Sequence, residues 1–299
     1  MIDSIPREEL ITVRTLLRHR RRISRSAGGN FLVALFLLLL GAFMLLPIYY
    51  TVVNSLKPIH ELFLFPPRLY VTSPTLDNFR GLIRIQGQAP VPFERYAFNS
   101  LFVTVAATGG FMLVASMAAY PLAKHRFPGK KVILQLVVFA ILFRTEVTAV
   151  PQYILMVKTR LIDTYAALIL PALATSFGVF LMTQFAEGIP EEILESARID
   201  GAKEIPLFFR MVLPMVRPAW LTLGIFTFTS VWSTTGTQFI YSEELKMLPA
   251  MLAQIGGAGL SRAGVSAAVS VLLMVPPVVM FLFCQRSVIE TMAHSGLKS

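Results

Sequence analysis

The chain has 299 residues, 55% of them hydrophobic and only 15% charged, and a formal net charge of +10. Charged residues make up about a quarter of a typical soluble domain, so this composition excludes a soluble globular protein and indicates a membrane protein. The positive charge could indicate nucleic-acid binding, but seven of the 27 Lys and Arg residues lie in the first 30 positions, directly before an apolar run. Such a segment is typical of contact with anionic membrane lipid, and no nucleic-acid partner is expected.

The N-terminal part of the chain predicts a basic arm followed by a membrane anchor. We expect residues 1–30 to form the arm and residues 31–52 the first transmembrane helix. The apolar run from Phe31 to Thr51 has the length, about twenty residues, that a helix needs to cross roughly 30 Å of hydrocarbon. No small-x-small cleavage site ends this run, so we interpret it as an uncleaved anchor and not as a signal peptide.

The rest of the chain predicts an extracytoplasmic segment and a five-helix core. Residues 53–98 are rich in proline and aromatic residues, which indicates a segment that lies on the membrane surface and packs over the spans. Residues 99–286 form the core, with apolar runs at 99–122, 132–157, 164–187, 219–241 and 264–286, and residues 287–299 form a C-terminal tail. The predicted fold is all-α, a polytopic membrane protein with six transmembrane helices.

The distribution of Lys and Arg predicts which side of the membrane each segment faces. Six spans place both termini on one side. With the N-terminus inside, the inner segments hold 17 of these residues and the outer segments nine. Positive residues near span ends are retained in the cytoplasm, so we expect both termini and the loop 188–218 to be cytoplasmic.

The loop 188–218 predicts two short helices. Pro190 suits a first helical turn, and Gly201 permits a turn or a close backbone approach. Ile193, Leu194 and Ala197 fall with Gly201 on one face of the first helix, and acidic residues occupy much of the rest. A helix this short needs packing to persist, so it either lies on the membrane surface or docks in a groove of a cytoplasmic partner.

Residue types that carry catalysis or bind cofactors are scarce. Cys284 is the single cysteine, and the four histidines are scattered over termini and loops, so neither a disulfide nor a metal site is expected. The chain contains no GxxxxGK[ST] motif, so ATP hydrolysis would have to come from another polypeptide. No catalytic residues, metal or cofactor are predicted in this chain.

The loop 188–218 closely resembles the EAA loop of ABC importer permeases. Its stretch 190–202 reads Pro-Glu-Glu-Ile-Leu-Glu-Ser-Ala-Arg-Ile-Asp-Gly-Ala, and 211–214 reads Met-Val-Leu-Pro. The family pattern is Glu-Ala-Ala, three residues, Gly, nine residues and Ile-x-Leu-Pro. Ser196 replaces the first Ala and Met211 the Ile, while the spacing is kept.

Further segments resemble the carbohydrate-uptake branch, the maltose and glycerol-phosphate type second permease, and these include Ser55 to Pro58, Ala118 to Tyr120, Arg126 to Gly129 and Asp163 to Tyr165. Relatives commonly have Trp-Asn in the fifth span, whereas this chain has Trp232-Ser233.

The resemblance implies a subunit of an ATP-driven, binding-protein-dependent importer in the cytoplasmic membrane of a prokaryote. Its implied partners are a second, homologous permease, two ATP-binding subunits that hold ATP and Mg, and an extracytoplasmic solute-binding protein. The implied cargo is an oligosaccharide or related carbohydrate. Coupling to the ATPase would involve Glu191, Glu195, Ser196, Ala197, Asp200, Gly201, Ala202, Leu213 and Pro214.

A sugar path would need aromatic rings for stacking and amides or hydroxyls for hydrogen bonds. Span residues of these types are Gln152, Tyr153, Trp232, Thr234, Gln238 and Tyr241. The same types also anchor helices at the membrane interface or bond neighbouring helices.

Arg144 and Glu146 are the ionisable pair of the third predicted span. Charged groups at this depth are costly, so either the two residues line the path, or they form a structural pair with each other or with the partner permease. An ion-coupled secondary transporter that uses this pair as a relay is the alternative function, and a membrane-embedded enzyme is a second rival.

Overall fold

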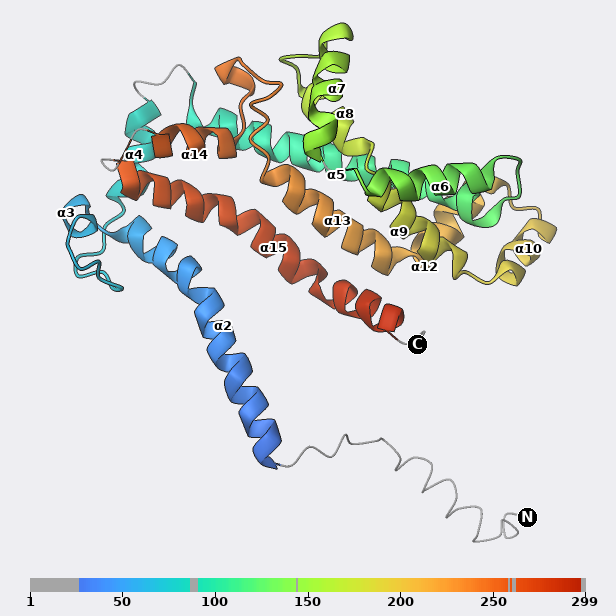
Figure 1. Ribbon diagram of the computed structural model, residues 1–299, viewed down its shortest axis with the longest axis horizontal. Helices are drawn as coiled ribbons and strands as arrows, with labels where there is room; N and C mark the ends of the chain where they lie inside the picture. The colour runs from blue at the N-terminus through green and yellow to red at the C-terminus, as the bar shows by residue number, and fades with distance from the viewer. Residues whose placement is uncertain (1–26, 87–90, 144, 258, 260–261, 297–299) are drawn as a thin grey trace. The chain divides into compact units, whose positions relative to one another are not determined.

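The computed structural model describes residues 27–86, 91–143, 145–257, 259 and 262–296. Most of the arm predicted over 1–30 therefore lies outside the described residues, as does Arg144. The described residues are helical and contain no strand (Figure 1). In chain order the helices are α2 (Ala27–Leu56), α3 (Ile59–Leu62), α4 (Asp77–Gln86), α5 (Phe93–Lys124), α6 (Lys130–Ile141), α7 (Thr145–Lys158), α8 (Tyr165–Leu173), α9 (Ser176–Glu187), α10 (Glu191–Ile199), α11 (Glu204–Leu207), the π-helical turn η1 (Phe208–Val212), α12 (Leu213–Met215), α13 (Arg217–Trp232), the 3-10 turn η2 (Glu243–Leu245), α14 (Leu248–Gly257) and α15 (Ala263–Gly296).

Three helices are long and apolar enough to cross a membrane by themselves, over Gly28–Leu56, Phe93–Lys124 and Ala263–Gln285. Three further pairs pass the same test as bent units: α6 with α7 at 109°, α8 with α9 at 41°, and Glu204–Met215 with α13 at 79°. The described part of the chain thus has six candidate spans if each bent pair counts as one. The all-α polytopic fold expected from the sequence is confirmed, but three spans are broken where single helices were expected.

The span expected at 219–241 differs most from the structure. Helix α13 ends at Trp232, and residues 233–241 leave the helix for a loop. Gly236 adopts φ +68° there, in a run of Ser and Thr residues. Left-handed backbone and short hydroxyl side chains both disfavour a continuing helix. Helix α13 passes the length test for a span only together with Glu204–Met215, from which a 79° bend near Val216 separates it.

The described residues fall into two compact units, 27–50 and 51–296. In the first, α2 exposes large apolar side chains such as Phe31, Phe36 and Phe43, as a lipid-facing helix does. In the second, α5 packs against α8, α9 and α13, and α13 packs against α15 (Figure 1).

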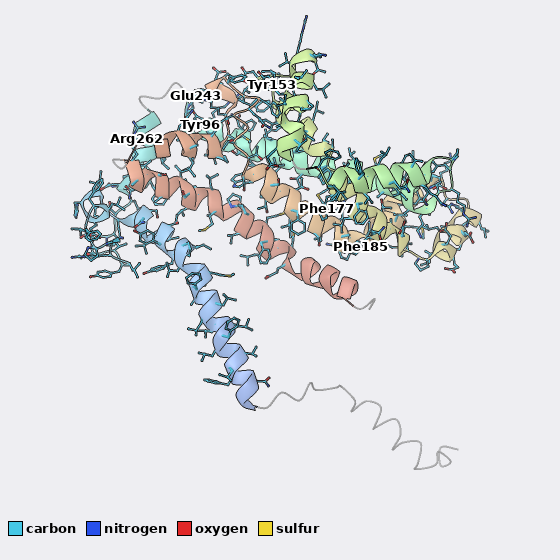
Figure 2. The ribbon with its side chains drawn as sticks, viewed as in Figure 1. Tyr96, Tyr153, Phe177, Phe185, Glu243 and Arg262 are labelled. Carbon is cyan, nitrogen blue, oxygen red and sulfur yellow. The ribbon has the colours of Figure 1, made fainter. Side chains whose placement is uncertain are left out.

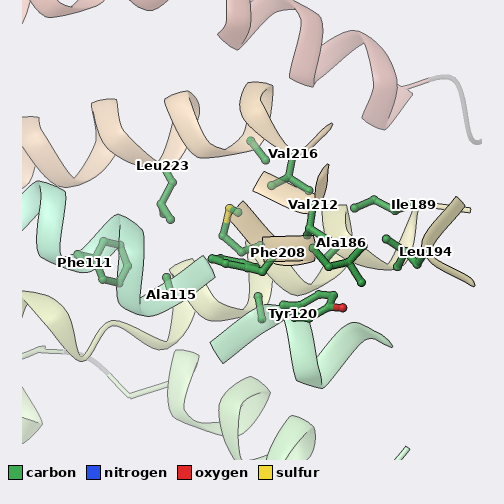
Figure 3. Close-up of a cluster of buried hydrophobic side chains, with 14 residues drawn as sticks. Phe111, Ala115, Tyr120, Ala186, Ile189, Leu194, Phe208, Val212, Val216 and Leu223 are labelled. Atoms are coloured by element: carbon green, nitrogen blue, oxygen red, sulfur yellow. The ribbon is translucent and has the colours of Figure 1, made fainter. Parts of the chain in front are cut away.

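The largest buried cluster lies between α5, α9, α13 and the loop 188–218, and Figure 3 shows its side chains. Phe111 and Tyr120 of α5 enter it together with Leu194 of α10 and Phe208 of the π-helical turn. A Cβ atom added at Gly178 of α9 would lie 2.1 Å from the Phe111 ring, so this glycine permits the close packing of α9 on α5. The loop 188–218 is therefore part of the core packing and not a free appendage.

Side-chain to backbone hydrogen bonds order the segment after α2. The Glu61 carboxylate, 5% exposed, accepts from the backbone N–H groups of Thr72 at 3.1 Å and Ser73 at 2.9 Å. These bonds, led by the one from Thr72, hold the Glu61 pKa below its ordinary value. The Asn78 amide donates to the carbonyls of Ser55 at 2.9 Å and Lys57 at 2.8 Å.

Candidate functional site

Helix α10 and the turn that follows it, residues 191–202, carry seven of the nine residues predicted to couple to an ATPase. Leu194 is fully buried and Ala197 is half-buried, and both pack on the large cluster. Ile193, expected on the same face, is 36% exposed, so the face that packs on the core is narrower than expected. Glu191, Glu195, Ser196 and Asp200 are exposed.

The turn after α10 explains the glycine of the motif. Gly201 has φ +86°, the left-handed region, and its N–H donates to the Arg198 carbonyl at 3.0 Å. The next N–H, of Ala202, donates to the Ala197 carbonyl at 3.0 Å. This pair of bonds is the Schellman arrangement that ends a helix and satisfies its last carbonyls. A Cβ atom on Gly201 would meet nothing within 4 Å, so within this chain the backbone angle, and not crowding, demands the glycine.

The last residues of the motif, Leu213 and Pro214, follow a segment that packs in the core. Leu213 begins α12 and packs partly against the large cluster, whereas Pro214 is exposed. The preceding π-helical turn buries both Phe208 and Val212. Such turns are rare and are frequently found at functional sites.

A second site is a cavity of about 1020 Å³ lined by α7, α8, α9 and the segment after α13. Three of the residues predicted for a sugar path line it, Gln152, Thr234 and Gln238. Its other polar side chains include Thr148 and Ser230, and none of its described lining residues is charged. Amides and hydroxyls can donate to and accept from a sugar, and the apolar walls can cover its ring faces.

The remaining path candidates lie elsewhere. The Tyr153 hydroxyl of α7, labelled in Figure 2, is 3.3 Å from the Tyr241 hydroxyl, and neither residue lines the cavity. Trp232 is buried, stacks on Phe228 with ring centroids 6.0 Å apart, and donates from Nε1 to the Leu273 carbonyl at 2.8 Å. These contacts give Trp232 a place in the packing of α13 on α15. Glu146 is exposed at the start of α7.

Asp163 orders the loop next to the cavity and was not singled out as a site residue from the sequence. Its Oδ1 accepts from the N–H groups of Tyr241 and Ser242, both at 3.0 Å, and from the Ser242 hydroxyl at 2.9 Å. Its own N–H donates to the Phe239 carbonyl at 2.9 Å, and its φ is +61°. The bond from the Ser242 N–H is the main reason that the Asp163 pKa lies below its ordinary value. Asp163 thereby fixes the segment that carries Gln238.

No group of three His, Cys, Asp or Glu residues in the described ranges could hold a metal ion.

Residues 111–287 match the family model described as the binding-protein-dependent transport system inner membrane component. The chain is 30% identical, over 95% of its length and 100% of the relative's, to the arabinooligosaccharides transport system permease protein AraQ of Bacillus subtilis. It is 27% identical, over 84% of its length and 92% of the relative's, to the sn-glycerol-3-phosphate transport system permease protein UgpE of Pectobacterium atrosepticum.

Solved structures share the fold. A bacterial ABC transporter involved in the import of the acidic polysaccharide alginate has a chain that superposes with a TM-score of 0.75 at 21% identity, over 88% of this chain and 98% of that one. The same kind of transporter in complex with an alginate pentasaccharide-bound periplasmic protein gives a TM-score of 0.60 at 15% identity, over 85% and 93%. The comparisons give no support to the ion-coupled alternative. The family resemblance read from the sequence is confirmed, and the chain belongs to the inner membrane components of binding-protein-dependent transport systems as a permease subunit of an ABC importer.

Proposed function

We propose that this permease subunit couples to a separate ATP-binding subunit through α10 and the turn that follows it. The observation that carries the proposal is that this loop has one side buried in the core and another side exposed. Leu194 anchors it in the core, while Ile199 and Ile205 are 86% and 73% exposed beside the acidic face of α10. Exposed apolar side chains rimmed by charge are typical of a protein interface. ATP and Mg²⁺ would be held by the partner.

The assembly we propose has a second, homologous permease and two ATP-binding subunits, and takes cargo from an extracytoplasmic solute-binding protein. The family description names a binding protein, and the alginate transporter was solved with a periplasmic one. Both termini and the loop 188–218 would face the cytoplasm, as the Lys and Arg distribution indicates.

The cargo we propose is an oligosaccharide or related carbohydrate that is uncharged. The named relatives transport arabinooligosaccharides and sn-glycerol-3-phosphate, one neutral and one anionic class. The described cavity lining offers amides and hydroxyls and no charged group, which favours the neutral class. Calorimetric titration of the solute-binding protein that supplies this importer tests the choice. Binding of neutral oligosaccharides supports it, and binding of anionic sugars alone overturns it.

The docking proposal is tested by Glu195→Lys in the reconstituted complex. Reversing an exposed charge in the contact should lower co-purification of the ATP-binding subunit about tenfold or more. Glu192→Gln, a substitution at another exposed acid of the same helix, is the milder comparison. If Glu195→Lys retains the ATP-binding subunit and transports at wild-type levels, the assignment of α10 to the interface is wrong.

A further inference from the structure

A network of polar side chains joins the end of α5 to both ends of α10. Tyr120 of α5 is 6% exposed, and its hydroxyl donates to Oε2 of Glu204 at 2.7 Å. The Arg198 guanidinium, from the last turn of α10, donates from Nε to the other oxygen of Glu204 at 3.0 Å. The Glu204 carboxylate therefore bridges α5 and α10 across the turn that contains Gly201.

The other end of α10 has its own connection to α5. The ammonium group of Lys124 donates to the carbonyls of Ile189 at 2.5 Å and Glu187 at 3.2 Å, just before α10 begins. It also lies 3.7 Å from the carboxylate of Glu191, the first residue of α10. The Lys124 side chain is 6% exposed, so this connection lies within the packed part of the loop.

Shared partners and two buried members, Tyr120 and Lys124, separate this network from ordinary surface ion pairs, while the Arg198 and Glu204 side chains are 31% and 49% exposed. Isolated exposed pairs contribute about 0–1 kcal/mol because water and salt screen them. Here Glu204 is shared by a buried hydroxyl and a guanidinium, and that guanidinium also lies 3.8 Å from Glu191. Hydrogen bonds that share partners support one another, and they fix orientation as well as distance.

The same helix α5 reaches the cavity. Val103 of α5 lines it, and Val103 lies 17 residues before Tyr120, a separation of roughly 25 Å along a helix. Helix α5 also packs against α8, whose residues Leu168 and Pro171 line the cavity. A displacement of the Tyr120 end can therefore reach the cavity wall through one continuous helix.

We propose that Tyr120, Lys124, Arg198 and Glu204 are positioning residues that make α10 and the end of α5 move as one body. The inference rests on the proposed docking of an ATP-binding subunit on α10. The partner moves α10, and the network carries that movement into α5 and so to the cavity. Without the network α10 still docks on the partner, but it rotates about the turn at Gly201 and α5 does not move with it.

The experiment reports cavity movement without any cargo. Leu155, which lines the cavity from α7, is replaced by cysteine in a Cys284→Ala background and labelled with an environment-sensitive fluorophore. The whole complex is then trapped with ATP, Mg²⁺ and orthovanadate, and the change in fluorescence is measured. Tyr120→Phe and Arg198→Gln are the test variants. Tyr120→Phe removes one oxygen and keeps the ring that packs on Phe208, with centroids 5.7 Å apart.

The expected result is normal co-purification and normal nucleotide trapping in both variants, with the fluorescence change reduced about threefold or more. The double variant Arg198→Gln, Glu204→Ala should reduce the fluorescence change no further than the worse of its two single variants does. Both substitutions remove the same connection, the one between Arg198 and Glu204. Arg210→Gln is the matched control, since its exposed guanidinium makes no ion pair or hydrogen bond within the described part of the loop.

Other outcomes overturn the inference in distinguishable ways. A full fluorescence change in Tyr120→Phe and Arg198→Gln would show that α10 moves the cavity without these residues. Loss of the ATP-binding subunit from the variants alone would assign them to docking and not to transmission. Failure of the unsubstituted chain to bind that subunit would reject the proposed function itself, and the network's role with it.

Discussion

Asp163 illustrates how one side chain can set the conformation of a distant segment. Its carboxylate collects three donors from Tyr241 and Ser242, residues far along the chain. The left-handed backbone at Asp163 is unfavourable for most residues, but Asp tolerates it better than larger side chains. The tertiary hydrogen bonds offset the local cost and position one wall of the cavity.

The stability of this loop should depend on pH through Asp163. Its pKa in the folded protein is below the ordinary value of 3.8, so the charged form is favoured by folding. The contribution is present above that ordinary value and is lost as the pH falls through the lowered pKa. Melting temperatures of the purified protein between pH 7 and pH 3 should fall less steeply below about pH 4 for Asp163→Asn than for the unsubstituted chain. The variant should also melt lower at pH 7.

Asp77→Asn is the control for that experiment. Its carboxylate is exposed and lies 3.5 Å from Arg80. Identical pH profiles for Asp163→Asn and the unsubstituted chain would contradict the role given to Asp163.

Among the elements, α5 and α9 depend on Gly178 for their close approach. Gly178→Ala would force the Phe111 ring to move, and overpacking of this kind costs roughly 1–3 kcal/mol of stability. Thermal unfolding of the detergent-purified protein measures the loss. Gly109→Ala is the matched control in α5, because its Cβ would meet nothing within 4 Å. Combining Gly178→Ala with Phe111→Leu should recover part of the lost stability, and no recovery would argue that the strain lies elsewhere.

Local patterns predicted the elements better than they predicted the breaks and contacts. The two short helices of the loop 188–218 and the turn at Gly201 were expected from Pro190, the acidic first turn and the glycine itself, and all are present. The end of α13 at Trp232 was not expected, because apolar composition alone does not mark where a helix stops.

Contacts between segments far apart in the sequence were also missed. The sequence around Tyr120 does not predict its hydrogen bond to Glu204, and the sequence around Asp163 does not predict its hydrogen bond from Ser242. Of the path candidates, the structure brings Gln152, Thr234 and Gln238 to one cavity and gives Trp232 a buried role on α15. An aromatic residue that can stack on sugar can equally stack on a neighbouring ring, and only the packing distinguishes the two.

For the whole molecule, the charge distribution predicts the side that each loop faces. In a Cys284→Ala background, Lys203→Cys in the turn after α10 should react with a membrane-impermeant maleimide in inside-out vesicles alone. Leu69→Cys, 55% exposed in the segment after α3, should react in right-side-out vesicles alone. The reverse pattern would invert the topology and would remove the loop 188–218 from any cytoplasmic partner.

The contact between Asn78 and Gly264 bears on how the chain is made. The Asn78 side chain lies where a Cβ on Gly264 would be, 2.2 Å from Asn78 Oδ1, so the segment after α2 closes against the start of the last helix. During synthesis that helix emerges last, and until it inserts, the Asn78 region lacks one of its walls. The contact between the Asn78 region and α15 can therefore form only near the end of translation. A chain that ends before α15 would lack this packing at the Asn78 region, so proteases should cleave that region more readily than in the whole protein.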